Sequence, residues 1–373
     1  MRYVVLSLDY EIFGNGTGDV RQHIIDPTER MARIADQYEL PITVFVDMEE
    51  VLAFERHATE LQQHCGYDPY SLVRRQVQEL AGRGHDPQLH LHPQWHQAAF
   101  KDGRWQLDEA KATVDSLFES LEETSDYIAS RKQALEAIAK TGNSTHRVSV
   151  YRAGAFSAQP GRKLIAALAD NEFKIDSSVV RGMRYEDENV SLDYRNAPSG
   201  RPAWRVQTDV AVEDSAGSLW EVPITSKPGR RINQLTPGRL KAKFSKNVPK
   251  EQQSRMVKQL GVGKNPFQVL RFLFQPIPLK FDFHNVAPAK LINWIRNVPK
   301  PSQGALDVVV LIGHSKEHID DAGFESLLHG LKNESEVKVV GFNEIASKLP
   351  SLHPSPPRPG RGIKGEVSNA VLS

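Results

Sequence analysis

The 373-residue sequence has one cysteine, almost no net charge and no long apolar run. Because Cys65 has no second cysteine to pair with, an internal disulfide is excluded and a reducing compartment is favoured. No stretch approaches the roughly 18 uninterrupted apolar residues of a membrane-spanning helix. Asp9 interrupts the amino-terminal apolar run too early for a signal peptide. We therefore expect a cytoplasmic protein without a transmembrane segment.

The net charge of +1 excludes a uniformly basic coat protein for nucleic acid, and no nucleic-acid partner is expected. This average conceals one basic segment. Between Lys227 and Lys258 ten lysines and arginines accompany a single acid, Glu251. The segment predicts a polar insertion or, alternatively, an edge that attracts phosphates or makes peripheral contact with an anionic membrane surface.

Ordinary globular composition, with 39% hydrophobic and 25% charged residues, predicts a sizeable core. We expect one barrel over residues 1–349, with a basic insertion at about 227–275. Residues 350–373 combine proline, glycine and serine without a periodic apolar face, which predicts a disordered tail.

Apolar runs of strand length alternate with segments of helical period, and this alternation predicts a parallel sheet with helical crossovers. The clearest helix is predicted over residues 27–38, with proline at its start. The predicted strands begin at Tyr3, Pro41, Pro87, Arg147, Phe173, Leu219, Phe281, Val308 and Val337.

Ionisable residues arrive where these apolar runs end. In a barrel of parallel strands all carboxyl ends open on one face, so residues far apart in the sequence would converge there. The residues at these ends are Asp9, Glu11, His90, His92, Arg152, Asp176 and His314.

Four of the 13 histidines fall between positions 85 and 96. His90 and His92 are two apart, so an extended strand points both imidazoles to one face. His96 follows His92 by four residues and could share an ion with it if the chain turns helical. With Asp9 or Glu11, either arrangement gives a two-histidine, one-carboxylate site that suits catalytic zinc. The alternative is a set of histidines with ordinary hydrogen bonds and two carboxylates that cap a turn.

In chain order these residues resemble the motifs of the polysaccharide deacetylase family, whose members carry the NodB homology domain. That family removes acetyl groups from N-acetyl sugars on a divalent metal, in a distorted (β/α)₇ barrel. The resemblance is carried by SLDYE at 7–11, by GHD and its following histidines at 84–96, by YRAG at 151–154, by IDSSV at 175–179 and by LIGH at 311–314.

The resemblance implies an α/β fold of this barrel type with insertions, and a hydrolase that acts on amide bonds of a carbohydrate. It makes Asp9 the general base for metal-bound water and His314 the general acid for the leaving amine. Arg152 would orient Asp9, and Asp176 would support His314. The implied substrate is a sugar or cell-envelope precursor, with phosphorylated or lipid-linked forms among the candidates.

Two departures decide the ligand set that the resemblance implies for a divalent metal, expected to be zinc. Tyr10 stands where the family has a second Asp, so the carboxylate would come from Glu11. Gln94 stands at the usual spacing from His90, so the second histidine is His92 or His96. Tyr151 and Trp95 are the expected substrate-binding residues.

Two other interpretations compete with this one. An amidohydrolase-like barrel could use His90 and His92 as its first metal pair, but there the pair normally closes the first strand and here it closes the third. A catalytically silent relative that binds glycans or partners is favoured by Tyr10 and Gln94 at ligand positions.

Overall fold

The computed structural model of the protein describes residues 1–234 and 266–352. Much of the predicted basic insertion and nearly all of the predicted tail therefore lie outside the described residues. Within the described ranges, no helix is long and apolar enough to cross a membrane.

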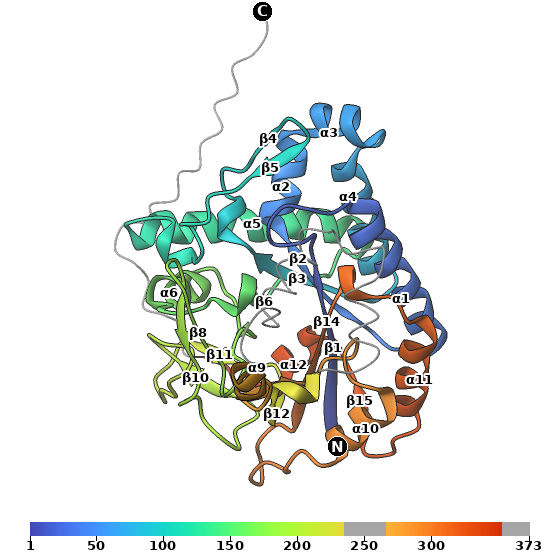
Figure 1. Ribbon diagram of the computed structural model, residues 1–373, viewed down its shortest axis with the longest axis vertical. Helices are drawn as coiled ribbons and strands as arrows, with labels where there is room; N and C mark the ends of the chain where they lie inside the picture. The colour runs from blue at the N-terminus through green and yellow to red at the C-terminus, as the bar shows by residue number, and fades with distance from the viewer. Residues whose placement is uncertain (235–265, 353–373) are drawn as a thin grey trace, which may run out of the picture.

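A curled sheet of mostly parallel strands forms the centre of the molecule (Figure 1). Its strand order is β10-β11-β7-β6-β3-β2-β1-β14, and β15 pairs with the start of β1, Arg2–Val4, on the edge opposite β14. Within this sheet the antiparallel pair is β10 with β11. The strands are β1 (Arg2–Tyr10), β2 (Thr43–Asp47), β3 (Asp86–Leu91), β6 (Val150–Ala153), β7 (Ile175–Asp176), β10 (Trp204–Val206), β11 (Leu219–Glu221), β14 (Val308–His314) and β15 (Val337–Val339).

Helices between the strands cover the outside of the sheet, as the predicted crossovers require (Figure 1). Neighbouring helices pack against one another around the sheet, for example α4 against α5 and α10 against α11. The larger helices are α1 (Asp26–Gln37), α2 (Met48–Arg56), α3 (Ala58–Cys65), α4 (Pro69–Gly82), α5 (Leu121–Gly142), α6 (Arg162–Asp170), α9 (Pro266–Leu273), α10 (Pro288–Arg296), α11 (Asp321–Lys332) and α12 (Phe342–Lys348).

Irregular backbone joins the two sides of the curled sheet. The N–H of Ile224 donates to the carbonyl of Val179 at 3.0 Å, and the N–H of Thr225 donates to the carbonyl of Val310 at 3.0 Å. Further along β14, the N–H of Ile312 donates to the carbonyl of Phe281, and the N–H of Phe283 donates to the carbonyl of Ile312, both at 3.0 Å. This seam completes a distorted α/β barrel, and the predicted fold class is confirmed.

Alternation along the strands separates the barrel interior from the layer beneath the helices. In β1, Val4, Leu6 and Leu8 belong to the outer hydrophobic core, whereas Val5 belongs to a separate inner cluster. Phe342 of α12 belongs to the inner cluster too, and its ring lies 5.7 Å from that of Phe45. An apolar filling of the barrel therefore ends in α12 at the amino ends of the strands.

Most predicted elements are present, with small shifts at their ends. The helix predicted over 27–38 is α1, Asp26–Gln37. The run from Phe281 forms no regular strand and pairs with β14 only through the bridge between Asp282 and Ile312. Three antiparallel strand pairs stand outside this sheet in the described residues: β4 (Ala99–Lys101) with β5 (Arg104–Gln106), β8 (Arg184–Glu186) with β9 (Ser191–Asp193), and β12 (Ser226–Arg230) with β13 (Pro276–Lys280).

The Gly-His-Asp part of the motif at residues 84–96 lies at the amino end of β3, whereas His90 and His92 lie at its carboxyl end. Asp86 is buried there and accepts hydrogen bonds from the Thr43 hydroxyl at 3.2 Å and the Gln88 amide at 2.7 Å. It also accepts from the backbone N–H of Asn343 at 3.0 Å and from its side-chain amide at 2.8 Å. Asp86 thereby anchors α12 across the lower end of the barrel.

We predict that Asp86→Ala lowers the free energy of unfolding by about 3 kcal/mol, because two buried and two partly buried donors lose this acceptor. Urea denaturation measures this loss. Asp86→Asn keeps a carbonyl acceptor and should lose less. If Asp86→Ala unfolds at the same urea concentration as the unchanged protein, the anchoring role is wrong.

Candidate active site

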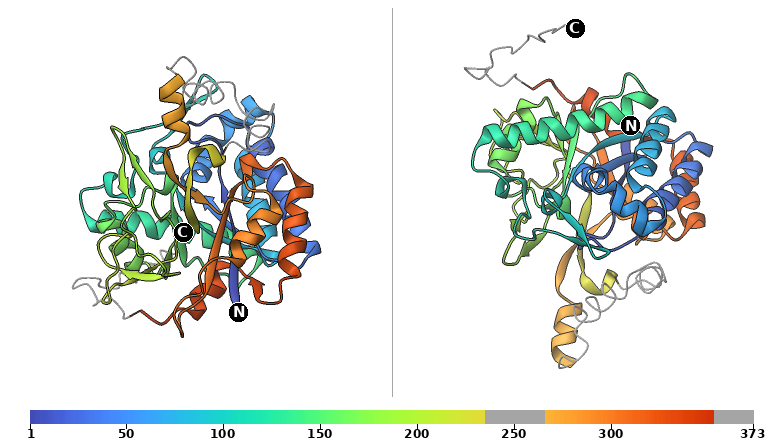
Figure 2. Two further views of the ribbon diagram at one scale, coloured as in Figure 1. Left: turned by 60° about the horizontal axis from the view of Figure 1, so that its bottom comes forward. Right: turned by 90° about the horizontal axis from the view of Figure 1, so that it is seen from above.

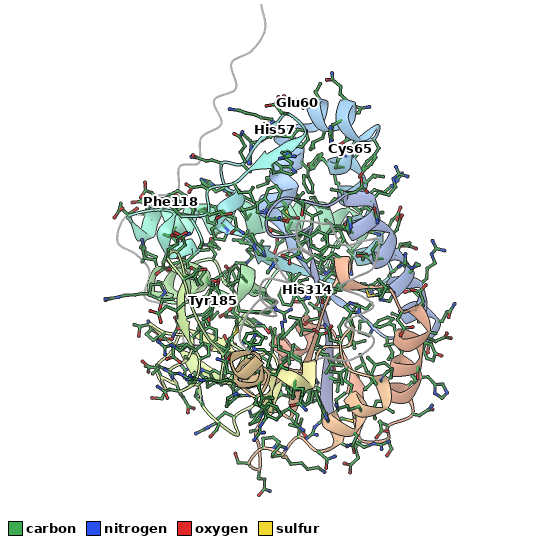
Figure 3. The ribbon with its side chains drawn as sticks, viewed as in Figure 1. His57, Glu60, Cys65, Phe118, Tyr185 and His314 are labelled. Carbon is green, nitrogen blue, oxygen red and sulfur yellow. The ribbon has the colours of Figure 1, made fainter. Side chains whose placement is uncertain are left out.

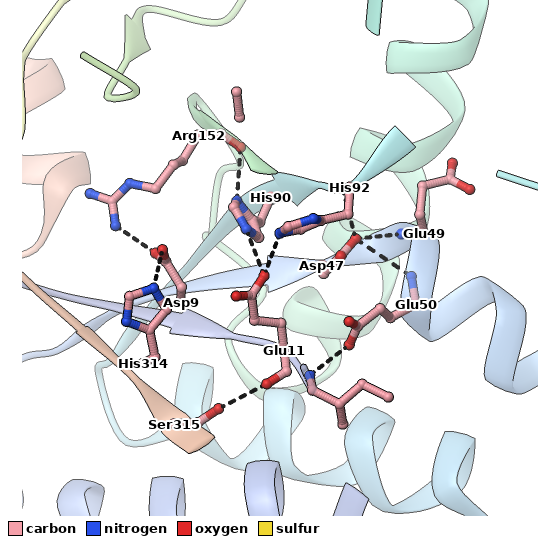
Figure 4. Close-up of polar contacts among 12 residues, drawn as sticks. Asp9, Glu11, Asp47, Glu49, Glu50, His90, His92, Arg152, His314 and Ser315 are labelled. Atoms are coloured by element: carbon pink, nitrogen blue, oxygen red, sulfur yellow. Dashed lines mark hydrogen bonds and ion pairs between the residues drawn. The ribbon is translucent and has the colours of Figure 1, made fainter. Parts of the chain in front are cut away.

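The carboxyl ends of four strands bring six predicted residues together (Figure 4). Parallel register sets the pairs: Asp9 of β1 lies beside His314 of β14, and His90 of β3 lies beside Arg152 of β6. Glu11 follows β1 and His92 follows β3 by the same period of two. In the view of Figure 3, His314 lies near the middle of the molecule, while His57, Glu60 and Cys65 lie at its upper edge.

Glu11, His90 and His92 form one buried cluster (Figure 4). The Nε2 atom of His90 lies 3.0 Å from Oε2 of Glu11, and the Nε2 atom of His92 lies 2.6 Å from the same oxygen. One ligand atom from each residue lies within 4.8 Å of the others, close enough to hold one metal ion. The spacing of two along the strand therefore turns both imidazoles to the same side, toward Glu11.

The hydrogen bonds of His90 show that the cluster suits a cation. Its Nδ1 lies 2.9 Å from the carbonyl oxygen of Arg152, which can only accept, so Nδ1 carries the proton. In the neutral ring, Nε2 then presents a lone pair toward the Glu11 carboxylate. Two facing acceptors need a proton or a metal ion between them, and a histidine held by a carbonyl at its far nitrogen is a common arrangement in metal sites.

Lys316 is a site residue that the sequence analysis missed. Its Nζ donates to Oε1 of Glu11 at 2.6 Å and to the carbonyl of Ile12 at 2.8 Å. Burial raises the pKa of Glu11, but Lys316 and His92 outweigh it and hold that pKa well below its ordinary value. Glu11 is therefore ionised, with Oε1 taken by Lys316 and Oε2 turned to the histidines.

Arg152 is fully buried and holds Asp9. Its Nη1 donates to Oδ1 of Asp9 at 2.6 Å, Nη2 donates to the Ser7 hydroxyl at 2.9 Å, and Nε donates to the carbonyl of Ser177 at 3.0 Å. Burial raises the pKa of Asp9, but Arg152, and then His90 and His314, lower it below the ordinary value. Asp9 is an oriented carboxylate, in the place that the motif predicts.

His314 stands between two carboxylates at the accessible side of the site. Its Nε2 lies 3.5 Å from Oδ2 of Asp9, and its Nδ1 lies 3.5 Å from Oε2 of Glu317. The side chain is 16% exposed. Burial lowers the pKa of His314, but Glu317 and Asp9 outweigh burial and raise it above the ordinary value. The ring therefore keeps its proton to a higher pH than a free histidine.

Asp176 is not the partner of His314, contrary to the expectation. It is fully buried, accepts from the Ser178 hydroxyl at 2.6 Å and is paired in register with Glu221 of β11. Burial raises the pKa of Asp176 to about 6, and burial with the neighbouring Asp176 raises the pKa of Glu221 well above its ordinary value. The partner of His314 is Glu317, three residues along the same turn.

Three other expected site residues lie outside the cluster. The turn Pro93–Trp95 carries His96 to Glu49, with His96 Nδ1 3.6 Å from Oε2, and to Arg131. Trp95 is fully buried against other aromatic rings, including Trp105. Tyr151 alternates with Arg152 along β6 and is buried in the outer core. None of the three side chains is placed to ligate the ion or to meet a substrate in this structure.

The two departures from the family motifs have local explanations. Tyr10 points from β1 to the outer layer, where its hydroxyl donates to Gln76 at 2.9 Å, so the next inward position belongs to Glu11. The amide nitrogen of Gln94 lies 3.0 Å from Nδ1 of His92, on the side of the ring away from Glu11.

Asp47, at the end of β2, was also missed. It caps α2 by accepting from the N–H of Glu49 at 3.0 Å, and the same oxygen accepts from the N–H of His92 at 3.3 Å. An aspartate between a strand and the sequence Met-Glu-Glu is a recognisable helix cap, which could have marked it. Its contact with His92 depends on the neighbouring strand, which no local pattern reveals.

No family model and no curated protein matches the sequence. Among solved structures, the chain is similar to a Mycobacterium smegmatis protein described provisionally as a polysaccharide deacetylase, with 17% identity and a TM-score of 0.44 over 95% of this chain and 94% of that one. It is also similar to a 4-α-glucanotransferase from Thermococcus litoralis, with 10% identity and a TM-score of 0.48 over 93% of this chain and 40% of that one.

A family 4 carbohydrate esterase from Streptomyces lividans, in complex with acetate, is similar at 10% identity and a TM-score of 0.33, over 88% of each chain. The structural neighbours thus include polysaccharide deacetylases and carbohydrate esterases. Identities and TM-scores are low throughout, so no residue role is taken from these proteins.

We predict that the protein binds one zinc ion and that His90→Ala weakens this binding by at least about 100-fold, because one of three protein ligands is lost. Titration calorimetry with zinc measures both. His96→Ala is the matched control and should bind zinc like the unchanged protein. Equal weakening in the two variants would contradict the ligand set.

The Asp176–Glu221 pair makes stability depend on pH. The folded protein retains protons that the unfolded chain releases, so the free energy of unfolding falls as pH rises from about 4 to above about 6, by about 1.4 kcal/mol per pH unit for each proton. Glu221→Gln should flatten this fall and raise stability at about pH 8. Urea denaturation over this pH range measures the change. Glu213→Gln, which alters a more exposed carboxylate, is the control. If stability depends on pH in the same way in both variants, the pairing of Asp176 with Glu221 is wrong.

Proposed function

We propose that the protein is a metal-dependent hydrolase that removes an acyl group, most simply N-acetyl, from a carbohydrate. One observation carries this proposal. A cation site of Glu11, His90 and His92 lies beside an ionised carboxylate, Asp9, and beside His314, whose proton is stabilised. Amide hydrolysis needs these three capabilities together: an electrophile, a proton acceptor and a proton donor.

The cation would be zinc, bound by Glu11, His90 and His92. When bound, it supplies Lewis acidity, which polarises an acyl carbonyl and makes water more acidic. Because Lys316 occupies Oε1 of Glu11, only Oε2 is offered to the ion. The hydrogen bond from His90 to the carbonyl of Arg152 fixes the ring with Nε2 toward the ion.

The protein residues account for the movement of protons. Asp9 accepts a proton from the attacking water, and Arg152 keeps Asp9 ionised and in position. His314 gives its proton to the nitrogen of the departing sugar amine, and Glu317 favours the protonated ring beforehand. Asp9 and His314 lie 3.5 Å apart, so the proton taken up by one can return to the other after product leaves.

A catalytically silent carbohydrate-binding relative is the second candidate. The Lys316 ammonium, 2.6 Å from Glu11, favours it, because a lysine can neutralise this carboxylate without a metal. An absence of zinc binding in the titration above would favour this candidate over the hydrolase.

We predict that His314→Ala lowers the rate of acetate release from N-acetylglucosamine oligomers by at least about 100-fold while zinc binding is retained. His90→Ala should lose activity together with zinc, and His96→Ala should keep both. The assay is acetate release in the presence of zinc. If both His314→Ala and His90→Ala release acetate at the normal rate, the site assignment is wrong.

The pH profile separates the roles of the two proton carriers. Activity should rise as Asp9 loses its proton and fall as His314 loses its proton, which gives a bell-shaped curve. Because Glu317 raises the pKa of His314, Glu317→Gln should move the falling limb to lower pH. An unmoved falling limb would show that His314 is not the acid.

A further inference from the structure

A two-stranded arm projects from the barrel (Figure 2, right). It consists of β12, β13, the turn η5 (Arg231–Gln234) and α9. Six large apolar side chains are exposed in the described part of the chain, and three lie on this arm: Ile232 at 39% exposure, Leu270 at 54% and Phe274 at 43%. The other three, Met1, Tyr185 and Val212, belong to separate segments.

The described part of the arm is basic as well as apolar. Residues 226–234 and 266–280 contain Lys227, Arg230, Arg231, Arg271 and Lys280 and no acidic residue. The guanidinium of Arg231 lies 4.0 Å from the ring centroid of Phe272, and that of Arg230 lies 5.4 Å from that of Phe274. Cations and apolar groups are thus interleaved on the arm.

We propose that this arm docks the protein on an anionic lipid bilayer surface. Exposed leucine, isoleucine and phenylalanine enter the boundary between headgroups and acyl chains, and the flanking arginines pair with anionic headgroups. Arginine stacked on an aromatic ring satisfies both environments, since the ring lies in the apolar layer and the charge at its edge. A nucleic acid would use the cations but gives no reason for the exposed aliphatic side chains.

The arm is joined directly to the candidate site. β13 ends at Lys280, and the next residues, Phe281 and Asp282, pair with β14 two residues before His314. Asn285 then donates to Glu317 at 3.4 Å. The base of the arm therefore lies next to β14, the strand that ends at His314.

The test is co-sedimentation of the full-length protein with vesicles. It should sediment with vesicles of phosphatidylcholine containing about a quarter phosphatidylglycerol, at about 0.15 M salt, and not with phosphatidylcholine alone. Arg230→Gln, Arg231→Gln and Arg271→Gln together should weaken binding by about 100-fold, from roughly fivefold for each cation near an anionic surface. Leu270→Ser with Phe274→Ser should weaken it by at least about tenfold.

Matched control variants carry the same changes elsewhere. Arg33→Gln, Lys300→Gln and Lys338→Gln remove three other exposed cations, and Tyr185→Ser with Val212→Ser removes two other exposed apolar side chains. Both controls should bind like the unchanged protein. The proposal is overturned if the unchanged protein fails to sediment with the anionic vesicles, if the controls lose as much binding as the arm variants, or if the Leu270/Phe274 variant binds normally.

Discussion

A buried guanidinium holds the upper end of this barrel together. Arg152 donates to Ser7 and Asp9 of β1 and to the backbone beyond β7. Its Cζ lies 4.0 Å from the ring centroid of Phe45, and its own carbonyl orients His90. One residue therefore positions Asp9, the proposed proton acceptor, and His90, a candidate ligand for a cation. An ion pair taken out of water is costly unless hydrogen bonds compensate for the lost hydration, and Arg152 donates four to the protein.

The turn that follows β14 divides the site into two electrostatic halves. Lys316 neutralises Glu11 on the side of the histidine cluster, and Glu317 stabilises positive charge on His314. Lys316 and Glu317 are adjacent and carry opposite charges, so they act in opposite ways on the ionisable groups on the two sides of Asp9. Lys316 holds the pKa of Glu11 well below its ordinary value, and Glu317 raises the pKa of His314, so that this ring keeps its proton to a higher pH.

The residues that could be predicted from the sequence are those whose placement follows from strand period and strand order. Asp9, Glu11, His90, His92, Arg152 and His314 end parallel strands, and such ends meet by necessity. Asp176 obeys the same rule, yet its partner is Glu221, from a strand whose register no local pattern specifies. His96 depended on how the chain turns after Pro93, and Trp95 and Tyr151 depended on which face of an element is outermost. Lys316 and Glu317 lie in the short turn Ser315–Glu317, where neither hydrophobic periodicity nor composition indicates a role.

The seam of the barrel also defines where the arm begins and ends. Thr225 and Phe281 flank it in the sequence, and the N–H of Phe281 donates to the carbonyl of Thr225 at 2.9 Å. The two ends of the arm thus meet at a single point of the barrel, and the named strands of the central sheet lie outside residues 226–280. A loop whose ends already touch can be lengthened at little entropic cost. We therefore expect changes in the length of this insertion to leave the fold of the barrel intact.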